Sequence, residues 1–118
     1  MNYQECDALL QGRNRNRRKI ANNTYLNRYD ETTINILLHN HNIVEFLANG
    51  TILYDTCGYN SRTTKDRMNR FGGASITQEN YRWYAHGIEV DRTWKNTDLL
   101  TAEQRQMNIL LTNEAKMA

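Results

Sequence analysis

The strongest chemical signal in the sequence is a run of five basic side chains within seven positions. Arginine and lysine neutralise nucleic-acid phosphates, and the release of condensed counterions makes such binding favourable and dependent on salt. Asn14 and Asn16, which alternate with the basic residues, add donors for sugars or base edges. A solvated loop has the same composition, so both interpretations stay open at this point. The basic residues are Arg13, Arg15, Arg17, Arg18 and Lys19.

The start of a helix predicted at residues 64–71 is a second candidate for phosphate binding. Unpaired backbone N–H groups at a helix N-terminus attract anions, and Arg62 and Lys65 would add positive charge beside them. Thr63 also has the position of an ordinary N-cap, with Asp66 three residues later, and a cap satisfies these groups without a ligand. The glycine-rich lead of a P-loop is missing from this segment.

Aromatic side chains are the third candidate, since the chain has seven Tyr and two Trp. On a sheet near basic residues they would stack on bases, and in a protein interface they would act as anchors. Burial in the core with a solvated polar tip is the simpler interpretation for most of them. The residues that we select for stacking or for an interface are Tyr59, Trp83 and Tyr84.

Motifs for catalysis or for metal binding are not recognisable in the sequence. There is no nucleophile elbow, no HExxH and no carboxylate pair with the spacing of a two-metal nuclease. His39 and His41 form an i, i+2 pair, but a closed zinc site needs four ligands. Cys57 across the sheet from His39 is a conceivable nucleophile and base, although a buried structural thiol is the simpler interpretation. We therefore predict a protein that is not an enzyme and has no metal site or cofactor.

Length and composition indicate one domain with a modest core, because the chain has 118 residues and is 39% hydrophobic. The formal net charge is only +2, so the charge is uneven along the chain and small in sum. No apolar run is long enough to cross a bilayer or to serve as a signal peptide. Two cysteines are too few for a disulfide framework, which indicates reduced thiols inside a cell and no membrane association.

The pair Asn49-Gly50 is the clearest turn signal in the chain. It lies between two apolar runs, and both residues tolerate positive φ, which is typical of a tight β-hairpin. An earlier strand, Thr33–His39, would join this hairpin through a loop at Asn40-His41. With a two-residue loop at Asn49-Gly50, the predicted cross-strand pairs are Leu47 with Ile52, Phe46 with Leu53, and Ile43 with Thr56.

Period-two alternation in these strands predicts which side chains form the core. The opposite side of the sheet is also apolar, with Leu37, Val44, Phe46 and Leu53, so it needs cover or a partner. A homodimer that buries this second face is one solution. The predicted core face consists of Ile34, Ile36, Leu38, Ile43, Leu47, Ile52 and Tyr54.

The predicted fold class is α+β, in a single domain that spans residues 1–118. An antiparallel meander of three to four strands comes first, followed by a short capped helix, a second hairpin and a C-terminal helix. The second hairpin would turn at Glu79-Asn80, and Arg92–Asp98 is expected to be irregular. The predicted bounds are 1–22 for a helix plus basic arm, 23–91 for the sheet with the helix at 64–71, and 101–116 for the C-terminal helix.

Several short sequence words in a fixed order resemble a group of small tailed-bacteriophage proteins without an assigned activity. The words include Asn22-Asn-Thr-Tyr-Leu26, Thr63-Thr-Lys-Asp-Arg-Met-Asn69 and Arg82-Trp-Tyr84. The likeness covers residues 19–83, and it departs at Cys57-Gly58-Tyr59, where the group tends to have Gly-Gly-Trp. The resemblance implies a phage origin and action in the host cytoplasm, and it implies no reaction.

Together these observations predict a non-enzymatic phage accessory protein that binds nucleic acid, a nucleotide or a nucleoprotein complex through its basic residues. The alternative is an inhibitor of the anti-CRISPR kind, which would dock on a host enzyme or defence complex with the second apolar face. Salt distinguishes the two, because phosphate binding weakens steeply as salt rises and an apolar interface barely responds.

Overall fold

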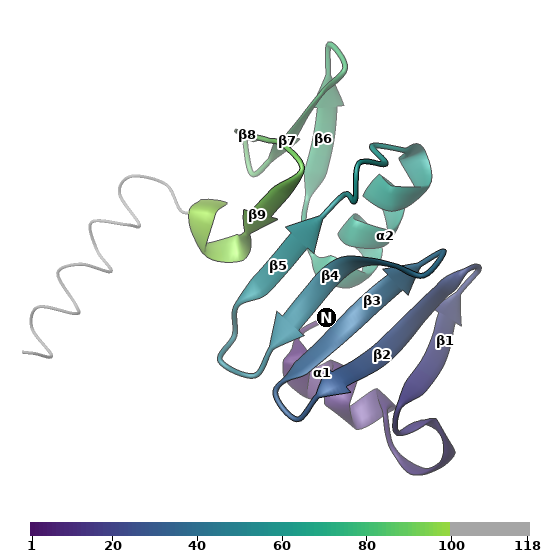
Figure 1. The fold of residues 1–118 in the computed structure, drawn as a ribbon. Helices are drawn as coiled ribbons and strands as arrows, with labels where there is room; N and C mark the ends of the chain where they lie inside the picture. Colours follow the sequence, from purple (N-terminus) through teal and green to yellow (C-terminus); the bar gives the residue numbers. More distant parts are fainter. Residues whose placement is uncertain (100–118) are drawn as a thin grey trace, which may run out of the picture.

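The structure, a computed structural model, describes residues 1–99, and the helix predicted at 101–116 lies outside them. Within this part, two α-helices and nine strands confirm the α+β class (Figure 1). None of the described helices is long and apolar enough to cross a membrane. The elements are α1 Tyr3–Leu9, β1 Arg17–Ala21, β2 Thr24–Asp30, β3 Thr33–Leu38, β4 His41–Leu47, β5 Ile52–Asp55, α2 Arg62–Gly72, β6 Ile76–Glu79, β7 Arg82–Ala85, β8 Ile88–Val90 and β9 Thr93–Lys95, with 3₁₀ turns at Gly12–Asn14 and Asn96–Leu99.

The strands form two antiparallel sheets, a large one in the order β1-β2-β3-β4-β5-β9 and a small one in the order β6-β7-β8 (Figure 1). The predicted antiparallel meander is present in the structure, but the prediction missed the strands at its two edges, β1 and β9. The basic run enters β1 at Arg17 and is therefore not a free arm, since charged side chains are well suited to an edge strand. At the other edge, β9 occupies part of the segment that was expected to be irregular.

Residues with left-handed backbone form the turns between several strand pairs. His39 and Asn40 have φ of +50° and +66°, which is the conformation whose twist matches a tight hairpin. The loop predicted at Asn40-His41 is thus wrong by one residue, and His41 begins β4. Asn80 and Tyr81, with φ of +51° and +67°, make the corresponding turn between β6 and β7.

The hairpin at Asn49-Gly50 exists, but its loop is wider than two residues. Leu47 N–H donates to the Thr51 carbonyl at 2.9 Å, and Asn49 Oδ1 accepts from Thr51 N–H at 2.9 Å. The cross-strand register consequently shifts by one residue, and all three predicted pairs are wrong. Such a shift moves every side chain of a strand to the opposite face relative to its partner. The observed pairs are Phe46 with Ile52, Glu45 with Leu53, and Val44 with Tyr54.

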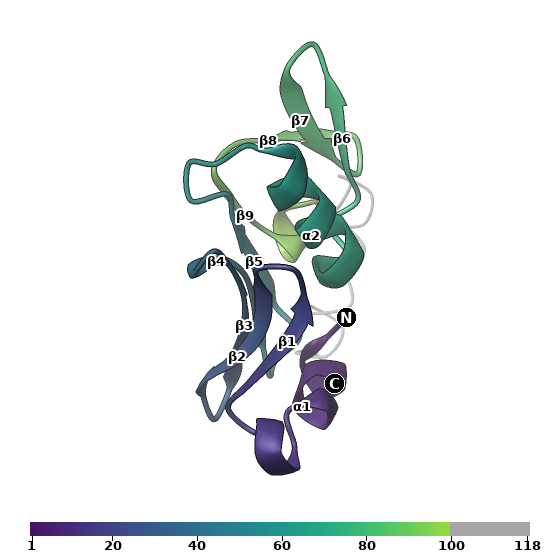
Figure 2. The ribbon, with the colours of Figure 1, turned by 90° about the vertical axis from the view of Figure 1, so that its right-hand side faces the viewer.

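Both helices pack on the same face of the large sheet, as Figure 2 shows. Arg28 on β2 binds Asp7 of α1 at 2.5 Å, and the Tyr54 hydroxyl on β5 donates to the Gly72 carbonyl of α2 at 2.6 Å. We call this side the covered face and the opposite side, which no described helix covers, the open face. The strand registers place these residues on the open face: Arg17, Lys19, Tyr25, Asn27, Asn35, Leu37, Asn42, Glu45, Leu53 and Lys95.

Val44 and Phe46 belong to the covered face and are fully buried, which corrects their predicted place on a second apolar face. The shifted hairpin register and a register break between Ile36 and Leu37 bring them there. Leu47, predicted in the core, is only half-buried. The remaining predicted core residues stay on the covered side or in the core, and the open face keeps few apolar side chains.

Helix α2 connects the two sheets. Its N-cap is Ser61, whose Oγ accepts from Thr64 N–H at 3.1 Å, so the cap predicted at Thr63 is wrong. Gly72 allows a close approach to the large sheet, because a Cβ there would lie 3.1 Å from a Tyr54 ring carbon. On the other side, the Asn69 amide makes two hydrogen bonds with the Ile76 backbone, of 2.6 and 3.0 Å, and so fixes β6.

Candidate nucleic-acid interface

The basic run forms one edge of the large sheet, and its side chains point in different directions. Arg17 and Lys19 lie on the open face, whereas Arg18 points to the covered face and donates to the last carbonyl of α1 at 3.3 Å. Arg13 and Arg15 are exposed in the segment before β1. Within residues 1–99, none of these five cations forms an ion pair. Their charge is therefore available to an anionic ligand.

The Arg17 side chain lies flat against the open face. Its guanidinium carbon is 4.4 Å from the centroid of the Tyr25 ring, and Nη2 donates to Asn40 Oδ1 at 3.2 Å. A guanidinium held over an aromatic ring is attracted by the ring face and keeps its other plane available for stacking. This arrangement presents both charge and a planar surface to solvent.

A row of side chains crosses the open face at right angles to the strands. Residues opposite one another on adjacent strands have Cβ atoms about 5 Å apart, so the row is continuous from the basic edge to the far edge. We call it the cross-sheet row. From β1 to β9 its members are Arg17, Asn27, Asn35, Glu45, Leu53 and Lys95.

Two amide oxygens on this face are buried without a hydrogen-bond donor among the described residues. Asn35 is 4% exposed, and its Oδ1 has no partner. The Asn42 amide is oriented by its Nδ2, which donates to Glu45 Oε1 at 2.5 Å, and this leaves Asn42 Oδ1 unpaired. A buried acceptor without a donor costs about 1–3 kcal/mol.

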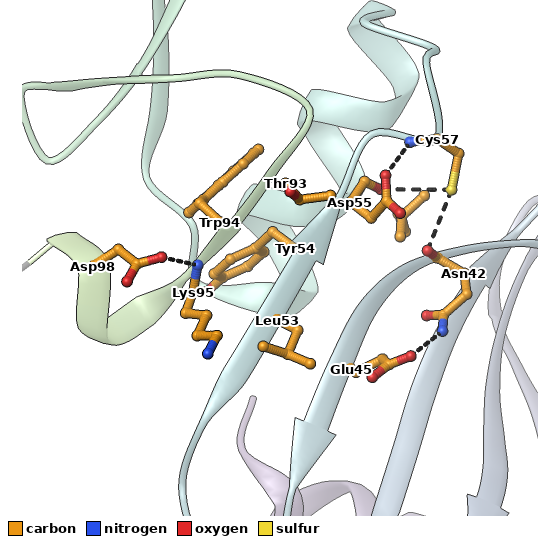
Figure 3. Close-up of a pocket in the computed structure, with 11 residues that line it drawn as sticks. Asn42, Glu45, Leu53, Tyr54, Asp55, Cys57, Thr93, Trp94, Lys95 and Asp98 are labelled. Atoms are coloured by element: carbon orange, nitrogen blue, oxygen red, sulfur yellow. Dashed lines mark hydrogen bonds between the residues drawn. The ribbon is translucent and has the colours of Figure 1, made fainter.

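A hollow of about 400 Å³ opens beside Asn42 and Glu45, between β4, β5 and β9 (Figure 3). Leu53 lies between Glu45 and Lys95 in the cross-sheet row and gives the hollow apolar surface. The hollow thus combines a carboxylate, an ammonium group and an aliphatic side chain. Such a mixture suits a flat polar ring better than a bare phosphate.

The other two carboxylates of the hollow are occupied within the protein. Asp55 Oδ1 accepts from Cys57 N–H at 2.7 Å and lies 3.4 Å from Arg92 Nε (Figure 3 shows the first contact). Asp98 Oδ2 accepts from Lys95 N–H at 3.0 Å. Glu45 likewise accepts a hydrogen bond, at Oε1 from Asn42 Nδ2, and its two oxygens can accept further donors because a carboxylate has about four acceptor positions.

The start of α2, where Arg62 and Lys65 were predicted to hold phosphate, lies on the covered side, away from the cross-sheet row. Lys65 Nζ donates to Gln78 Oε1 at 3.1 Å and so supports the small sheet, while Arg62 is exposed. A second hollow of about 290 Å³ lies next to this helix start and includes His39 and His41 in its lining. The structure does not bring these two cations together with the basic edge.

The three selected aromatic residues have different environments. Tyr59 is exposed, with its ring 4.9 Å from the His41 ring. Trp83 is 4% exposed in the core, so almost none of its ring is available for the predicted stacking or interface role. Tyr84 is half-buried on β7 of the small sheet. Tyr25, which was not selected, is the aromatic side chain that lies among the cations.

Neither thiol is placed as a nucleophile. Burial raises the pKa of Cys6 to about 11, and burial together with the Asp55 carboxylate raises the pKa of Cys57. Cys57 Sγ donates to the Asn42 carbonyl at 3.3 Å. Raised pKa values keep both thiols protonated and weakly reactive at neutral pH. Among residues 1–99, no group of three His, Cys, Asp or Glu side chains has a geometry that could hold a metal ion.

Two of the sequence words that carried the phage resemblance contact each other. Arg67 in the helix word donates from Nε to Thr24 Oγ1 at 2.8 Å and from Nη2 to the Asn22 carbonyl at 3.4 Å. Met68 in the same word is fully buried in the core. These words therefore fix α2 against the turn between β1 and β2, and their roles are architectural.

The family model for the Kyanoviridae Gp96 protein matches residues 1–112. The chain belongs to the Kyanoviridae Gp96 family. This is a phage protein family, which agrees with the expected phage origin. No curated protein and no solved structure matches the chain significantly.

The polar residues of the cross-sheet row in this Kyanoviridae Gp96 chain were missed by sequence analysis. Asn35, between Ile34 and Ile36, carried a usable signal, because a polar residue inside an apolar strand marks the side that the core does not occupy. Glu45, between Val44 and Phe46, carried the same signal one strand later. Their alignment across the sheet depends on the register, which the sequence did not reveal.

Proposed function

We propose that this protein is a non-enzymatic phage accessory protein that binds single-stranded nucleic acid across its open face in the host cytoplasm. The cross-sheet row, which begins at cations without an ion pair and continues over a sheet face that no helix within residues 1–99 covers, is the observation that carries the proposal. In this arrangement Arg17 and Lys19 hold phosphates, while the amides of Asn27 and Asn35 face the bases. The tailed-phage group with the same sequence words is, in this proposal, the Kyanoviridae Gp96 family itself.

A single strand fits this face better than a duplex does. Sheets that bind single strands combine a positive groove for the backbone with planar side chains on which bases stack. The Asn27 amide and the Glu45 carboxylate of the cross-sheet row are suited to hydrogen bonds with base edges, which are accessible in a single strand. A duplex keeps those Watson–Crick edges occupied.

The experiment is fluorescence anisotropy with labelled single-stranded DNA and RNA at 50 and 200 mM salt. Each phosphate that a cation neutralises contributes about 0.7 to the slope of log affinity against log salt for a single strand. Lys19→Ala should lower affinity and reduce the slope by nearly one such step, because Lys19 lies on the open face. Binding that is absent at 50 mM salt would remove the proposal.

Arg18→Ala is the matched control, because Arg18 is the neighbouring residue on the same strand and carries the same charge on the opposite face. It should leave the salt slope nearly unchanged. Equal effects of the two variants would mean that the ligand responds to the net charge of the edge and does not lie on the open face.

The alternative, an inhibitor that docks on a host protein, draws on a different observation. Tyr81 is 96% exposed at the turn of the β6–β7 hairpin. Its backbone φ is +67°, a conformation that residues other than glycine seldom adopt. Exposed tyrosines are frequent anchors of protein interfaces. Under this alternative, Tyr81→Ala would abolish association with the host protein and leave nucleic-acid affinity unchanged.

A further inference from the structure

We infer that the hollow between β4, β5 and β9 is a base-binding pocket that prefers guanine. This rests on the proposed binding of single-stranded nucleic acid and adds to it a site and a ligand. The hollow includes the half of the cross-sheet row that is remote from the basic edge, so a nucleic-acid strand held at β1 can extend toward it. Glu45 and Lys95 are the residues that would read the base.

The hydrogen-bonding groups of the hollow favour guanine over the other bases. On the acceptor side is the Glu45 carboxylate, which Asn42 Nδ2 orients by a hydrogen bond of 2.5 Å, and on the donor side is Lys95 Nζ. Guanine has two adjacent donors, N1–H and the N2 amino group, next to one acceptor, O6, on its Watson–Crick edge. Adenine and cytosine offer one amino group beside an unprotonated ring nitrogen, and thymine or uracil offers one N–H between two carbonyls. Guanine therefore matches an acceptor-rich site with one cation.

The surroundings of the hollow suit a base as well. Leu53 supplies an apolar surface for the ring, and the volume of about 400 Å³ lies in the range of small-molecule sites. In the adjacent strand, opposite Glu45, lies Asn35, whose buried Oδ1 is unpaired.

The spacing between the two ends is compatible with a short oligonucleotide. Three strand spacings of about 4.8 Å separate Arg17 on β1 from Glu45 on β4, which gives about 14 Å. This corresponds to about four nucleotides at the 3.4 Å spacing of stacked bases. One bound strand can consequently reach both the cations and the pocket.

The test compares two labelled oligonucleotides about ten nucleotides long, one of thymine alone and one with a single central guanine. The wild-type protein should bind the guanine-containing strand about tenfold more tightly, the scale of one well-made set of base contacts. Glu45→Gln should remove this preference and leave affinity for the all-thymine strand the same or higher, because a negative charge is lost. Glu79→Gln, on the small sheet, removes the same charge and should keep the preference.

The outcomes separate the pocket from the proposed function. Equal binding of both strands by the wild-type protein would overturn the guanine pocket and leave single-strand binding intact, whereas no binding of either strand would remove both. Arginine amide, added as a competitor, tests whether the hollow receives a cationic side chain of a partner protein. We expect arginine amide to displace neither oligonucleotide. If instead the protein binds arginine amide through Glu45 and shows no preference for guanine, the assignment is overturned. Thermal melting of each variant checks that it is folded.

Discussion

The two faces of the large sheet are built from the same strands and differ in almost everything else. The covered face is continuous and apolar, with Ile34, Ile36 and Phe46 fully buried beneath two helices. The open face has polar side chains at matching positions, among them Asn35 and Glu45 on the same strands. Alternation along a strand lets one segment stabilise the fold with one set of side chains and present a ligand surface with the other. Changes on the two faces should therefore have separable effects.

The largest difference is expected from truncation of neighbouring apolar residues on opposite faces. Phe46→Ala removes a fully buried ring and should lower the free energy of unfolding by about 3–5 kcal/mol. Leu53 is half-buried on the open face, so Leu53→Ala should lower the free energy of unfolding by well under half of that amount. Urea denaturation followed by circular dichroism measures both values. Similar losses would mean that the open face is itself part of a core.

The second effect concerns the helix on the covered face. Arg67→Met removes the hydrogen bonds to Thr24 and to the Asn22 carbonyl and should cost about 1–3 kcal/mol, because Thr24 is buried. Lys65→Met, two residues earlier on the same helix, loses only an exposed contact with Gln78 and should cost less than about 1 kcal/mol. The same denaturation experiment compares the two.

Stability should also fall at alkaline pH, and the covered face is the cause. The pKa of Cys6 is raised from 9.0 to about 11 by burial, and that of Tyr54 from 10.0 to about 12. Above pH 9 the unfolded chain loses these protons first, so the folded state binds more protons and stability decreases as pH rises. Stability contributed by the neutral Cys6 thiol is full below pH 9 and is lost as pH rises through about 11.

Thermal melting between pH 8 and 11 measures this decline. Cys6→Ala should make it shallower by removing one of the two groups. Cys57→Ala is the control with a smaller effect, because Cys57 is only half-buried. A melting temperature that stays flat from pH 9 to 11 would contradict the assignment.

The smallest effect has the opposite sign. Asn35→Val replaces an amide whose buried Oδ1 has no partner with a side chain favoured in strands, and it should raise stability by up to about 1 kcal/mol. The same change should weaken binding of single-stranded nucleic acid, which is a trade-off typical of functional sites. Asn27 is next to Asn35 in the cross-sheet row, but its side-chain oxygen is not both buried and unpaired. Asn27→Val should therefore not stabilise the fold. Lower stability of Asn35→Val would indicate that the amide serves the fold.

The sequence revealed the elements better than it revealed their alignment. The Asn49-Gly50 signal located a hairpin correctly, but the hydrogen bond from Thr51 N–H to the Asn49 side chain widened its loop and shifted the register. That shift, together with the register break between Ile36 and Leu37, placed Phe46 in the core and removed the apolar surface on which a docking role had been based. Two local irregularities in the strand pairing thus decided which side chains each face presents.

The candidate site was predictable only in part for the same reason. The charge of the run from Arg13 to Lys19 was visible in the sequence, whereas its division between two faces required β1 to pair with β2. Trp83 was selected because tryptophan suits both binding and burial, and only tertiary packing distinguishes these roles. Asn35 and Asn42 became candidates once the structure showed their oxygens to be buried and unpaired.

The path of the chain through the small sheet has a practical consequence. After β5 the chain builds β6 and β7 before β9 returns to pair with β5. A backbone cut between Asn80 and Tyr81 would therefore leave two fragments that share two antiparallel ladders, β6 with β7 and β5 with β9. The hairpin tip is thus the natural place to insert a fluorescent tag or to split the molecule for complementation, because reassembly would restore both ladders.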